Sequence, residues 1–193
     1  MFIWDWLTGM LSYLGLYKKS GKLLLLGLDN AGKTSLLRML RDDRMGQHNP
    51  TIHPTSEELC IGKIKFTTFD LGGHRSARKV WLDYFPLVDA IVFLIDVADQ
   101  ARFEEAKQEL NYILTEETLS TVPILILGNK IDLFNAVSEE QLLSAFQLHP
   151  VKTGKGPMDK SNLRGRPLEL YMISVFKKTG YAEAFRWLSQ FID

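Results

Sequence analysis

The fold of this 193-residue chain is decided by a short stretch near its start that reads GLDNAGKT and runs from Gly27 to Thr34. It fits the pattern G-x-x-x-x-G-K-[ST], in which glycines let the backbone wrap closely around a polyphosphate. Backbone N–H groups and the positive end of the following helix then face the anion. The pattern predicts that Lys33 reaches the β- and γ-phosphates and that the Thr34 hydroxyl ligates Mg²⁺.

The sequence on both sides of this P-loop alternates between apolar strands and amphipathic helices. Continuous apolar runs predict strands buried on both faces, at Leu23–Leu26 and Ala90–Asp96. Further strands are expected at Glu57–Ile61, Lys65–Phe69, Ile124–Leu127 and Leu168–Ile173. Helices are expected at Ser35–Arg41, Ser76–Phe85, Arg102–Leu114, from Ser138 onward and at Tyr181–Phe191, and Gln147–Arg166 predicts a long surface loop. This alternation predicts an α/β fold, a P-loop NTPase with a mostly parallel six-stranded sheet and helices on both faces.

Charge and cysteine content narrow the class of protein. Lys and Arg number 23, as do Asp and Glu, so the formal net charge is zero, which argues against a nucleic-acid partner. Cys60 is the only cysteine, so no internal disulfide can form and a reducing, cytosolic setting fits. We expect Cys60 to be a small core or edge residue of a strand rather than a reactive thiol.

The first residues, Met1–Tyr17, are crowded with bulky apolar side chains, and small or polar residues recur every three to four positions. This spacing predicts an amphipathic helix that lacks the cleavage site of a signal peptide and is shorter than the ~18–20 residues needed to span a membrane. It can lie in a membrane interface, with Lys18, Lys19 and Lys22 near anionic headgroups, or pack on its own domain, and the two states can alternate. We therefore divide the chain into a membrane-binding helix, residues 1–19, and a nucleotide-binding domain, residues 20–193. The candidate membrane-binding side chains are Phe2, Ile3, Trp4, Trp6, Leu7, Met10, Leu11 and Leu14.

A second motif identifies the base. The segment Asn129–Asp132 reads NKID, directly follows a predicted buried strand and fits N-K-x-D. The Asp132 carboxylate can accept hydrogen bonds from the N1–H and 2-amino groups of guanine, and adenine offers neither donor. The Lys130 stem can lie over the base, and Asn129 can tie this segment to the P-loop. The motif therefore predicts a guanine nucleotide.

Two further candidate nucleotide-binding segments lie at the carboxyl ends of predicted strands. In the segment DLGGH, Asp70 can hold the hydration shell of Mg²⁺ and Gly73 can offer its N–H to a γ-phosphate. The segment SVF, which starts at Ser174, can meet the base through backbone groups. Ligands of such sheets bind where the strands end, so all four segments should converge there. The residues expected at GTP or GDP are Asp29, Asn30, Ala31, Gly32, Lys33, Thr34, Ser35, Gly73, Asn129, Lys130, Asp132, Ser174, Val175 and Phe176.

With these segments in this order, the chain resembles the small Ras-like GTPases. It looks most similar to the Sar-type branch of the Arf/Sar family, the GTPases that start COPII vesicle coats. The residues that carry the closer match are 27–34, 50–59, 66–74 and 185–190, and the resemblance covers essentially the whole chain. It implies a Ras-like fold with a G domain that exchanges GDP for GTP and hydrolyses GTP slowly.

The resemblance also implies roles for particular side chains. Thr34 and Thr51 would ligate Mg²⁺ in the GTP state, Asp70 would act through water, and Asp29 would lie close to the metal. His74 stands where Ras-like enzymes usually carry Gln, so we assign it to orienting the attacking water.

The family resemblance implies partners as well. An inner-coat protein, rather than Arg75 or Arg78, would supply the activating arginine. The outer coat and an exchange factor in the endoplasmic reticulum (ER) membrane would be further partners. Phe2 stands where Arf-type proteins carry a myristoylated glycine, so bulky side chains must anchor the chain in ER lipids. The expected location is the cytosol and the cytoplasmic face of the ER membrane, with the Golgi membrane as a further site.

Three other functions remain open. An Arf-like trafficking switch would act mainly by GTP-dependent binding with little hydrolysis, although Phe2 and His74 disfavour it. A P-loop kinase of small metabolites is disfavoured by the N-K-x-D motif. A membrane-remodelling protein would use hydrolysis only secondarily, and its activity is compatible with the Sar-type function.

Overall fold

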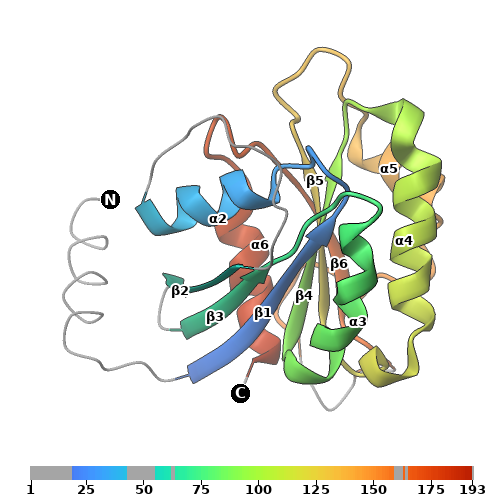
Figure 1. Ribbon diagram of the computed structural model, residues 1–193. Coiled ribbons are helices and arrows are strands. Elements are labelled where there is room, and N and C mark those ends of the chain that lie inside the picture. The colour runs from blue at the N-terminus through green and yellow to red at the C-terminus, as the bar shows by residue number, and fades with distance from the viewer. Residues whose placement is uncertain (1–18, 43–54, 62–63, 159–162, 164, 193) are drawn as a thin grey trace.

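A computed structural model describes residues 19–42, 55–61, 64–158, 163 and 165–192 of the chain (Figure 1). Its centre is a six-stranded sheet in the order β2-β3-β1-β4-β5-β6. Only β2 and β3 pair antiparallel, and the other neighbours are parallel. The strands are β1 (Lys19–Gly27), β2 (Thr55–Ile61), β3 (Ile64–Asp70), β4 (Ala90–Asp96), β5 (Ile124–Asn129) and β6 (Leu168–Ile173). The predicted α/β fold with a mostly parallel six-stranded sheet is confirmed.

Helices cover both faces of this sheet. Figure 1 shows α2 and α6 on one side and α3, α4 and α5 on the other. The α-helices are α2 (Lys33–Asp42), α3 (Trp81–Tyr84), α4 (Phe103–Thr115), α5 (Glu139–Phe146) and α6 (Tyr181–Leu188). Short 3₁₀ turns add η1 (Ala77–Val80), η2 (Phe85–Leu87), η3 (Gln100–Arg102), η4 (Glu117–Leu119) and η6 (Ser189–Phe191).

The apolar strands explain why the sheet has a core on each face. Successive side chains of a strand point to opposite sides. Leu24 therefore packs in one cluster with Trp81 of α3 and Leu110 of α4, whereas Leu25 packs in the other with Phe185 of α6. Burying each such side chain fully is worth about 1.5–3 kcal/mol, so the two clusters fix the sheet between its helices.

The expected single helix at Ser76–Phe85 is wrong. The structure instead has three short pieces there, η1, α3 and η2. Two side chains tie these turns back to the preceding segment: Trp81 Nε1 donates to the Gly72 carbonyl (3.2 Å) and Arg78 Nε donates to the Gly73 carbonyl (2.7 Å). Pro86 lies in η2 and has no N–H to continue an α-helix. Apolar periodicity gave no sign of these ties.

The segment before β6 is irregular where it is described, as expected for a loop. Its stem is nevertheless fixed to the core. Buried Glu169 accepts a hydrogen bond from the Gly154 N–H (2.6 Å), and Trp187 Nε1 donates to the Gly154 carbonyl (2.8 Å). Cys60 is exposed on β2, which is an edge strand, in agreement with the expected edge position.

Of the amino-terminal helix predicted at residues 1–19, the structure describes the last residue alone. Lys19 is the first residue of β1, and residues 1–18, with all the candidate membrane-binding side chains, lie outside the described residues. Within the described part of the chain, none of the helices combines the length and the apolarity that crossing a membrane requires.

Candidate nucleotide-binding site

The predicted segments meet at one edge of the sheet. The P-loop follows β1, Asp70 ends β3, Asn129 ends β5 and Ser174 follows β6. Since β3, β1, β4, β5 and β6 run parallel, their carboxyl ends share that edge. This is the edge at which open α/β sheets bind ligands.

The glycines of the P-loop are required by close backbone approach. Gly27 has φ +133°, and a Cβ there would lie 2.3 Å from the Leu94 carbonyl oxygen. Gly32 has φ +102°, and its Cβ would lie 2.4 Å from Nδ2 of Asn129. Both conformations exclude a side chain. Between them Asn30 is exposed at φ 63°, and the loop then enters α2.

Lys33 is the first residue of α2, and its side chain reaches back to the start of this loop. Its side chain is buried, and its Nζ donates to the carbonyls of Gly27 (3.0 Å) and Leu28 (2.9 Å). Burial lowers the pKa of Lys33 to about 8, and the negative charges of Asp70 and Asp29 oppose that shift. The loop thus holds a buried cation where the motif predicts phosphates.

The Thr34 hydroxyl and the Asp70 carboxylate, both predicted to hold Mg²⁺, are in contact with each other. Thr34 Oγ1 donates a 2.6 Å hydrogen bond to Oδ2 of Asp70, whose side chain is buried. Mg²⁺ prefers such oxygen donors and uses one or two protein ligands together with phosphates and water. Among the described residues, no group of three or more His, Cys, Asp or Glu could hold a metal alone. The donor set therefore fits a magnesium ion shared with phosphates, and Thr51 lies outside the described residues.

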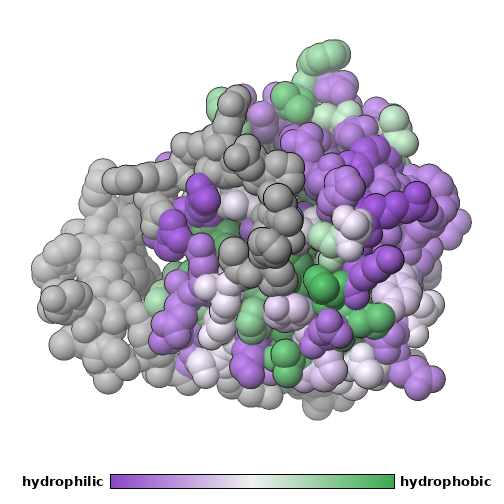
Figure 2. All heavy atoms as spheres, in the orientation of Figure 1, coloured by the Kyte–Doolittle hydropathy of each residue, from purple (hydrophilic) through white to green (hydrophobic). Residues whose placement is uncertain are grey.

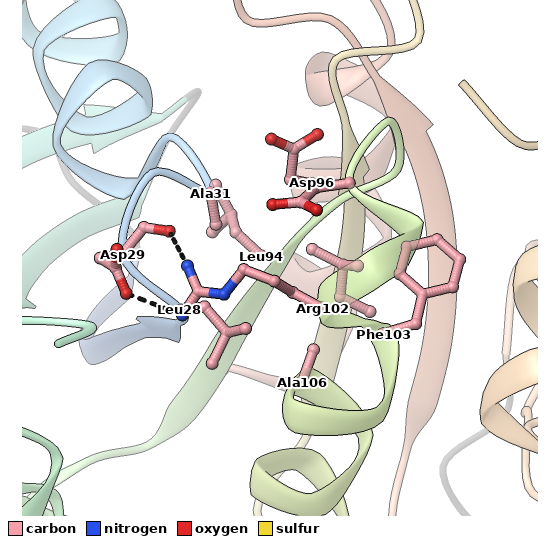
Figure 3. Close-up of a pocket in the computed structure, with 10 residues that line it drawn as sticks. Leu28, Asp29, Ala31, Leu94, Asp96, Arg102, Phe103 and Ala106 are labelled. Atoms are coloured by element: carbon pink, nitrogen blue, oxygen red, sulfur yellow. Dashed lines mark hydrogen bonds and ion pairs between the residues drawn. The ribbon is translucent and has the colours of Figure 1, made fainter. Parts of the chain in front are cut away.

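Asp29 faces a different partner. Its Oδ1 accepts a hydrogen bond from Nη2 of Arg102 (2.9 Å; Figure 3), and this contact holds the pKa of the Asp29 carboxyl below its usual value. The hollow beside this pair measures about 10 Å³, room for about one water molecule, so it is no ligand pocket. The predicted proximity of Asp29 to a metal stays a prediction.

Asn129 links the base motif to the rest of the site. Its side chain is 3% exposed, Nδ2 donates to the Ala31 carbonyl (2.9 Å), and Oδ1 accepts from the Val175 N–H (3.1 Å). The predicted tie to the P-loop is confirmed, and the same amide also holds the segment after β6. Three of the four predicted segments are therefore joined through one side chain.

The neighbouring groups of the base motif are also paired. Asp132 Oδ1 accepts a hydrogen bond from Ser174 Oγ (2.5 Å). Lys130 has φ 74°, and its ammonium pairs with Oδ2 of Asp96 at the end of β4 (2.6 Å). Phe176 is 71% exposed. These contacts fix the Asp132 carboxylate and the Lys130 head on either side of the β5 end.

The segment after β3 reaches the P-loop directly. A Cβ on Gly73 would lie 2.3 Å from the Asp29 nitrogen, so the two backbones are in contact and only glycine fits. His74 is exposed next to it, with Nδ1 3.3 Å from Ser76 Oγ. Arg78 is buried, and its Nε donates to the Gly73 carbonyl.

Sequence reasoning missed the residues that support this site. Arg78, Arg102 and Glu105 form a charged network behind the P-loop. In the sequence they look like ordinary charges of solvated helices. The i,i+3 spacing of Arg102 and Glu105 could have indicated a pair, but not its partners in other elements.

The described residues also line a larger cavity of about 540 Å³. It lies between the end of α4 and the segment before β6, and it includes none of the predicted site residues. Its lining residues are Leu114, Pro150, Val151, Lys152, Thr153, Met158, Leu163, Gly165, Arg166 and Leu168.

Exposed apolar side chains follow the base motif. Ile131, Leu133 and Phe134 are exposed, Phe134 almost completely. Figure 2 shows hydrophobic residues gathered on the loop after β5, whereas hydrophilic residues dominate the surface over α4. The end of β5 therefore carries both the polar base motif and an apolar loop.

Known proteins are similar to this chain in sequence and in fold. The sequence profile of the ADP-ribosylation factor family matches residues 7–192. The chain is 48% identical over 190 residues to the small COPII coat GTPase SAR1 of Giardia intestinalis, covering 97% of this chain and 98% of that protein. It is 47% identical over 199 residues to the small COPII coat GTPase SAR1 of Nicotiana tabacum, covering 100% of both. The Arl6 BBS3 small GTPase from Trypanosoma brucei with bound nucleotide analogue GppNp has a similar structure, with a TM-score of 0.74, 26% identity and coverage of 89% of this chain and 96% of that one.

Proposed function

This chain belongs to the ADP-ribosylation factor family of small GTPases, which are GTP hydrolases, and on that premise we propose that it is the switch that starts COPII coats at the ER membrane. Its GTP form inserts the amino-terminal helix into the membrane and recruits the coat for transport from the ER to the Golgi. The observation that carries the nucleotide part is the buried Asn129 amide, which joins the P-loop to both base segments.

The guanine specificity is assigned to Asp132. Its carboxylate offers acceptors to the N1–H and 2-amino groups of the base, and a donor left unpaired in a buried site is costly. The Ser174 hydroxyl supports its orientation. The P-loop backbone, Lys33 and the Gly73 N–H receive the phosphates.

We propose that the protein promotes hydrolysis by positioning the phosphates, a magnesium ion and the attacking water rather than by covalent catalysis. Thr34 and Asp70 would hold a magnesium ion, which supplies positive charge to the phosphates as they react. The exposed His74 beside Gly73 orients the attacking water. Arg78 is committed to other contacts. As the similarity to Sar-type GTPases implies, we assign the activating arginine to the inner-coat protein.

We divide the chain into a helix, residues 1–19, and a G domain, residues 20–193, and we assign membrane binding to the helix. Burying a Phe, Trp or Leu side chain fully is worth about 1.5–3 kcal/mol, so several partly inserted side chains give weak and reversible binding. Reversibility suits a protein that leaves the membrane after hydrolysis. The partners are the inner and outer COPII coat, an ER exchange factor and ER lipids.

Nucleotide competition tests the first part of the proposal. Fluorescent GTP bound to the protein should be displaced by GTP and GDP but not by ATP. ITP, which lacks the 2-amino group of guanine, should compete about tenfold less well than GTP. In Asp132→Ala this difference between GTP and ITP should disappear. Equal competition by ATP and GTP would contradict a GTPase function.

Flotation and turnover test the second part. The protein should float with liposomes of ER composition when loaded with a non-hydrolysable GTP analogue and stay behind with GDP. Equal flotation in both states would exclude a nucleotide-controlled helix. Turnover on those liposomes should rise when inner-coat protein is added, whereas binding without stimulated turnover would favour the Arf-like switch with little hydrolysis.

A further inference from the structure

A closed ring of contacts joins the P-loop to Gly73 by way of α4. Arg102, at the end of η3, donates from Nη2 to the Asp29 carboxylate (2.9 Å) and from Nη1 to the Asp29 carbonyl (3.3 Å). Figure 3 shows this side chain reaching across to Asp29. Arg102 Nε donates to Oε2 of Glu105 (2.9 Å), so the P-loop is tied to the first turn of α4.

The other oxygen of Glu105 binds a second arginine. Glu105 Oε1 accepts from Nη2 of Arg78 (2.6 Å), Arg78 Nη1 donates to Glu109 (2.7 Å), and Arg78 Nε donates to the Gly73 carbonyl (2.7 Å). The Arg78 side chain is 6% exposed, and a charge that is buried to this degree needs such partners. In the part of the chain that the structure describes, Glu105 is therefore the carboxylate shared between the arginine on Asp29 and the arginine on Gly73.

The ring closes where Gly73 touches the P-loop backbone at Asp29. The Lys33 ammonium binds the carbonyls of Gly27 and Leu28 in the same short stretch. A P-loop lysine contacts the β- and γ-phosphates of a bound nucleotide. Gly73 lies against the same stretch, and its N–H, assigned above to the phosphates, is the group expected at the γ-phosphate.

Hydrogen bonds within the ring shift the pKa values of three of its members, Asp29, Glu105 and Arg102, toward their charged forms. Hydrogen bonding to Arg78 lowers the pKa of the Glu105 carboxyl, and Arg102 does the same for Asp29. Hydrogen bonding to Asp29 raises the pKa of Arg102. Charge-assisted hydrogen bonds are roughly twice as strong as neutral ones, so the ring can hold Gly73 in place.

We propose that Glu105 is a positioning residue that couples the P-loop to Gly73 and thereby sets how strongly this protein prefers GTP to GDP. The inference rests on the proposed guanine-nucleotide function. Glu105 acts only through its two arginines, which fix Asp29 and Gly73. Without the shared carboxylate Arg78 keeps its bonds to Glu109 and to the Gly73 carbonyl but loses its link to Arg102 and Asp29. Gly73 is then held less firmly against the P-loop, and only a nucleotide with a γ-phosphate loses a contact.

The test compares Glu105→Gln with Glu104→Gln. Glu104 is the adjacent residue of α4, is exposed and accepts a hydrogen bond from Gln108 of the same helix, so it is a matched control. Affinities for GDP and for a non-hydrolysable GTP analogue are measured with fluorescent nucleotides. The ratio of GTP-analogue to GDP affinity should fall about fivefold or more in Glu105→Gln and stay unchanged in Glu104→Gln.

Arg78→Lys provides a second variant because an ammonium cannot bind Gly73, Glu105 and Glu109 at once. It should shift the ratio in the same direction, and it decides the question if Glu105→Gln does not fold. An equal loss of affinity for both nucleotides, or a lowered melting temperature with an unchanged ratio, would show a structural role only and overturn the proposal. A wild-type protein that does not prefer guanine nucleotides would instead overturn the proposed function.

Discussion

Thr34 and Asp70, 36 residues apart in the sequence, are joined by a 2.6 Å hydrogen bond from the Thr34 hydroxyl to the Asp70 carboxylate. The contact places the start of α2 against the end of β3, beside the Lys33 ammonium, whose pKa responds to the Asp70 charge. The two groups proposed to hold Mg²⁺ are thus already together.

The first prediction concerns this pair. Asp70→Asn keeps the size of the side chain but removes its charge, so the Mg²⁺ concentration needed for half-maximal GTP binding should rise about 10–100-fold. A magnesium titration of GTP binding measures this effect. Asp89→Asn is the matched control, because Asp89 is exposed just before β4, at the opposite edge of the sheet. An unchanged magnesium requirement in Asp70→Asn would contradict the assignment.

The second prediction concerns the amide of Asn129. Asn129→Ala leaves the Ala31 carbonyl and the Val175 N–H without their partner, and each buried unsatisfied group costs about 1–3 kcal/mol. We expect a lower free energy of unfolding and weaker GTP binding together. Asn135→Ala removes an exposed amide that donates to the Ala98 carbonyl, and it should change neither quantity. Denaturant unfolding and nucleotide titration provide the two measurements; wild-type stability in Asn129→Ala would refute the bridging role.

The third prediction concerns pH. The Lys33 pKa of about 8 lies far below the usual lysine value because burial disfavours the charged form. A bound polyphosphate favours that charged form and raises the pKa, so binding takes up a proton above pH 8. GTP affinity should therefore fall by up to about tenfold per pH unit as the pH rises above 8.

Calorimetry checks this dependence, because titrations in two buffers with different ionisation enthalpies count the protons that binding takes up. Lys33→Arg carries a permanent charge and should lose the dependence, even if it binds more weakly. A flat affinity profile from pH 7 to about 9.5 in the wild-type protein would rule out the assigned titration.

The fourth prediction concerns His74. His74→Gly should leave GTP affinity intact, because the side chain is exposed and contacts Ser76 rather than the P-loop. Hydrolysis stimulated by inner-coat protein on liposomes should slow by about 100-fold or more, since a water-orienting group is lost. Single-turnover hydrolysis with and without the coat protein measures the change. Arg75→Ala, at the neighbouring exposed position, should behave as wild type. Normal stimulated turnover in His74→Gly would contradict the assignment of His74 to orienting the attacking water.

The sequence alone determined the sheet, most of its helices and the four segments at its edge. Apolar runs such as Ala90–Asp96 report burial on both faces directly, and the P-loop glycines report backbone conformations that only glycine adopts. The amide of Asn129 could also be assigned, because its motif has a fixed place at the end of a strand.

Only the tertiary structure revealed the ring of Asp29, Arg102, Glu105 and Arg78. Its members come from four separate segments, the P-loop, η1, η3 and α4. Arg78, Arg102 and Glu105 look like solvated surface charges until the fold buries Arg78 and turns Glu105 toward two arginines. The break in the helix expected at Ser76–Phe85 was also hidden from the sequence, since side-chain contacts back to the carbonyls of Gly72 and Gly73 override the helical periodicity. Sequence patterns report what each residue prefers locally, whereas contacts between distant charges exist only after the chain has folded.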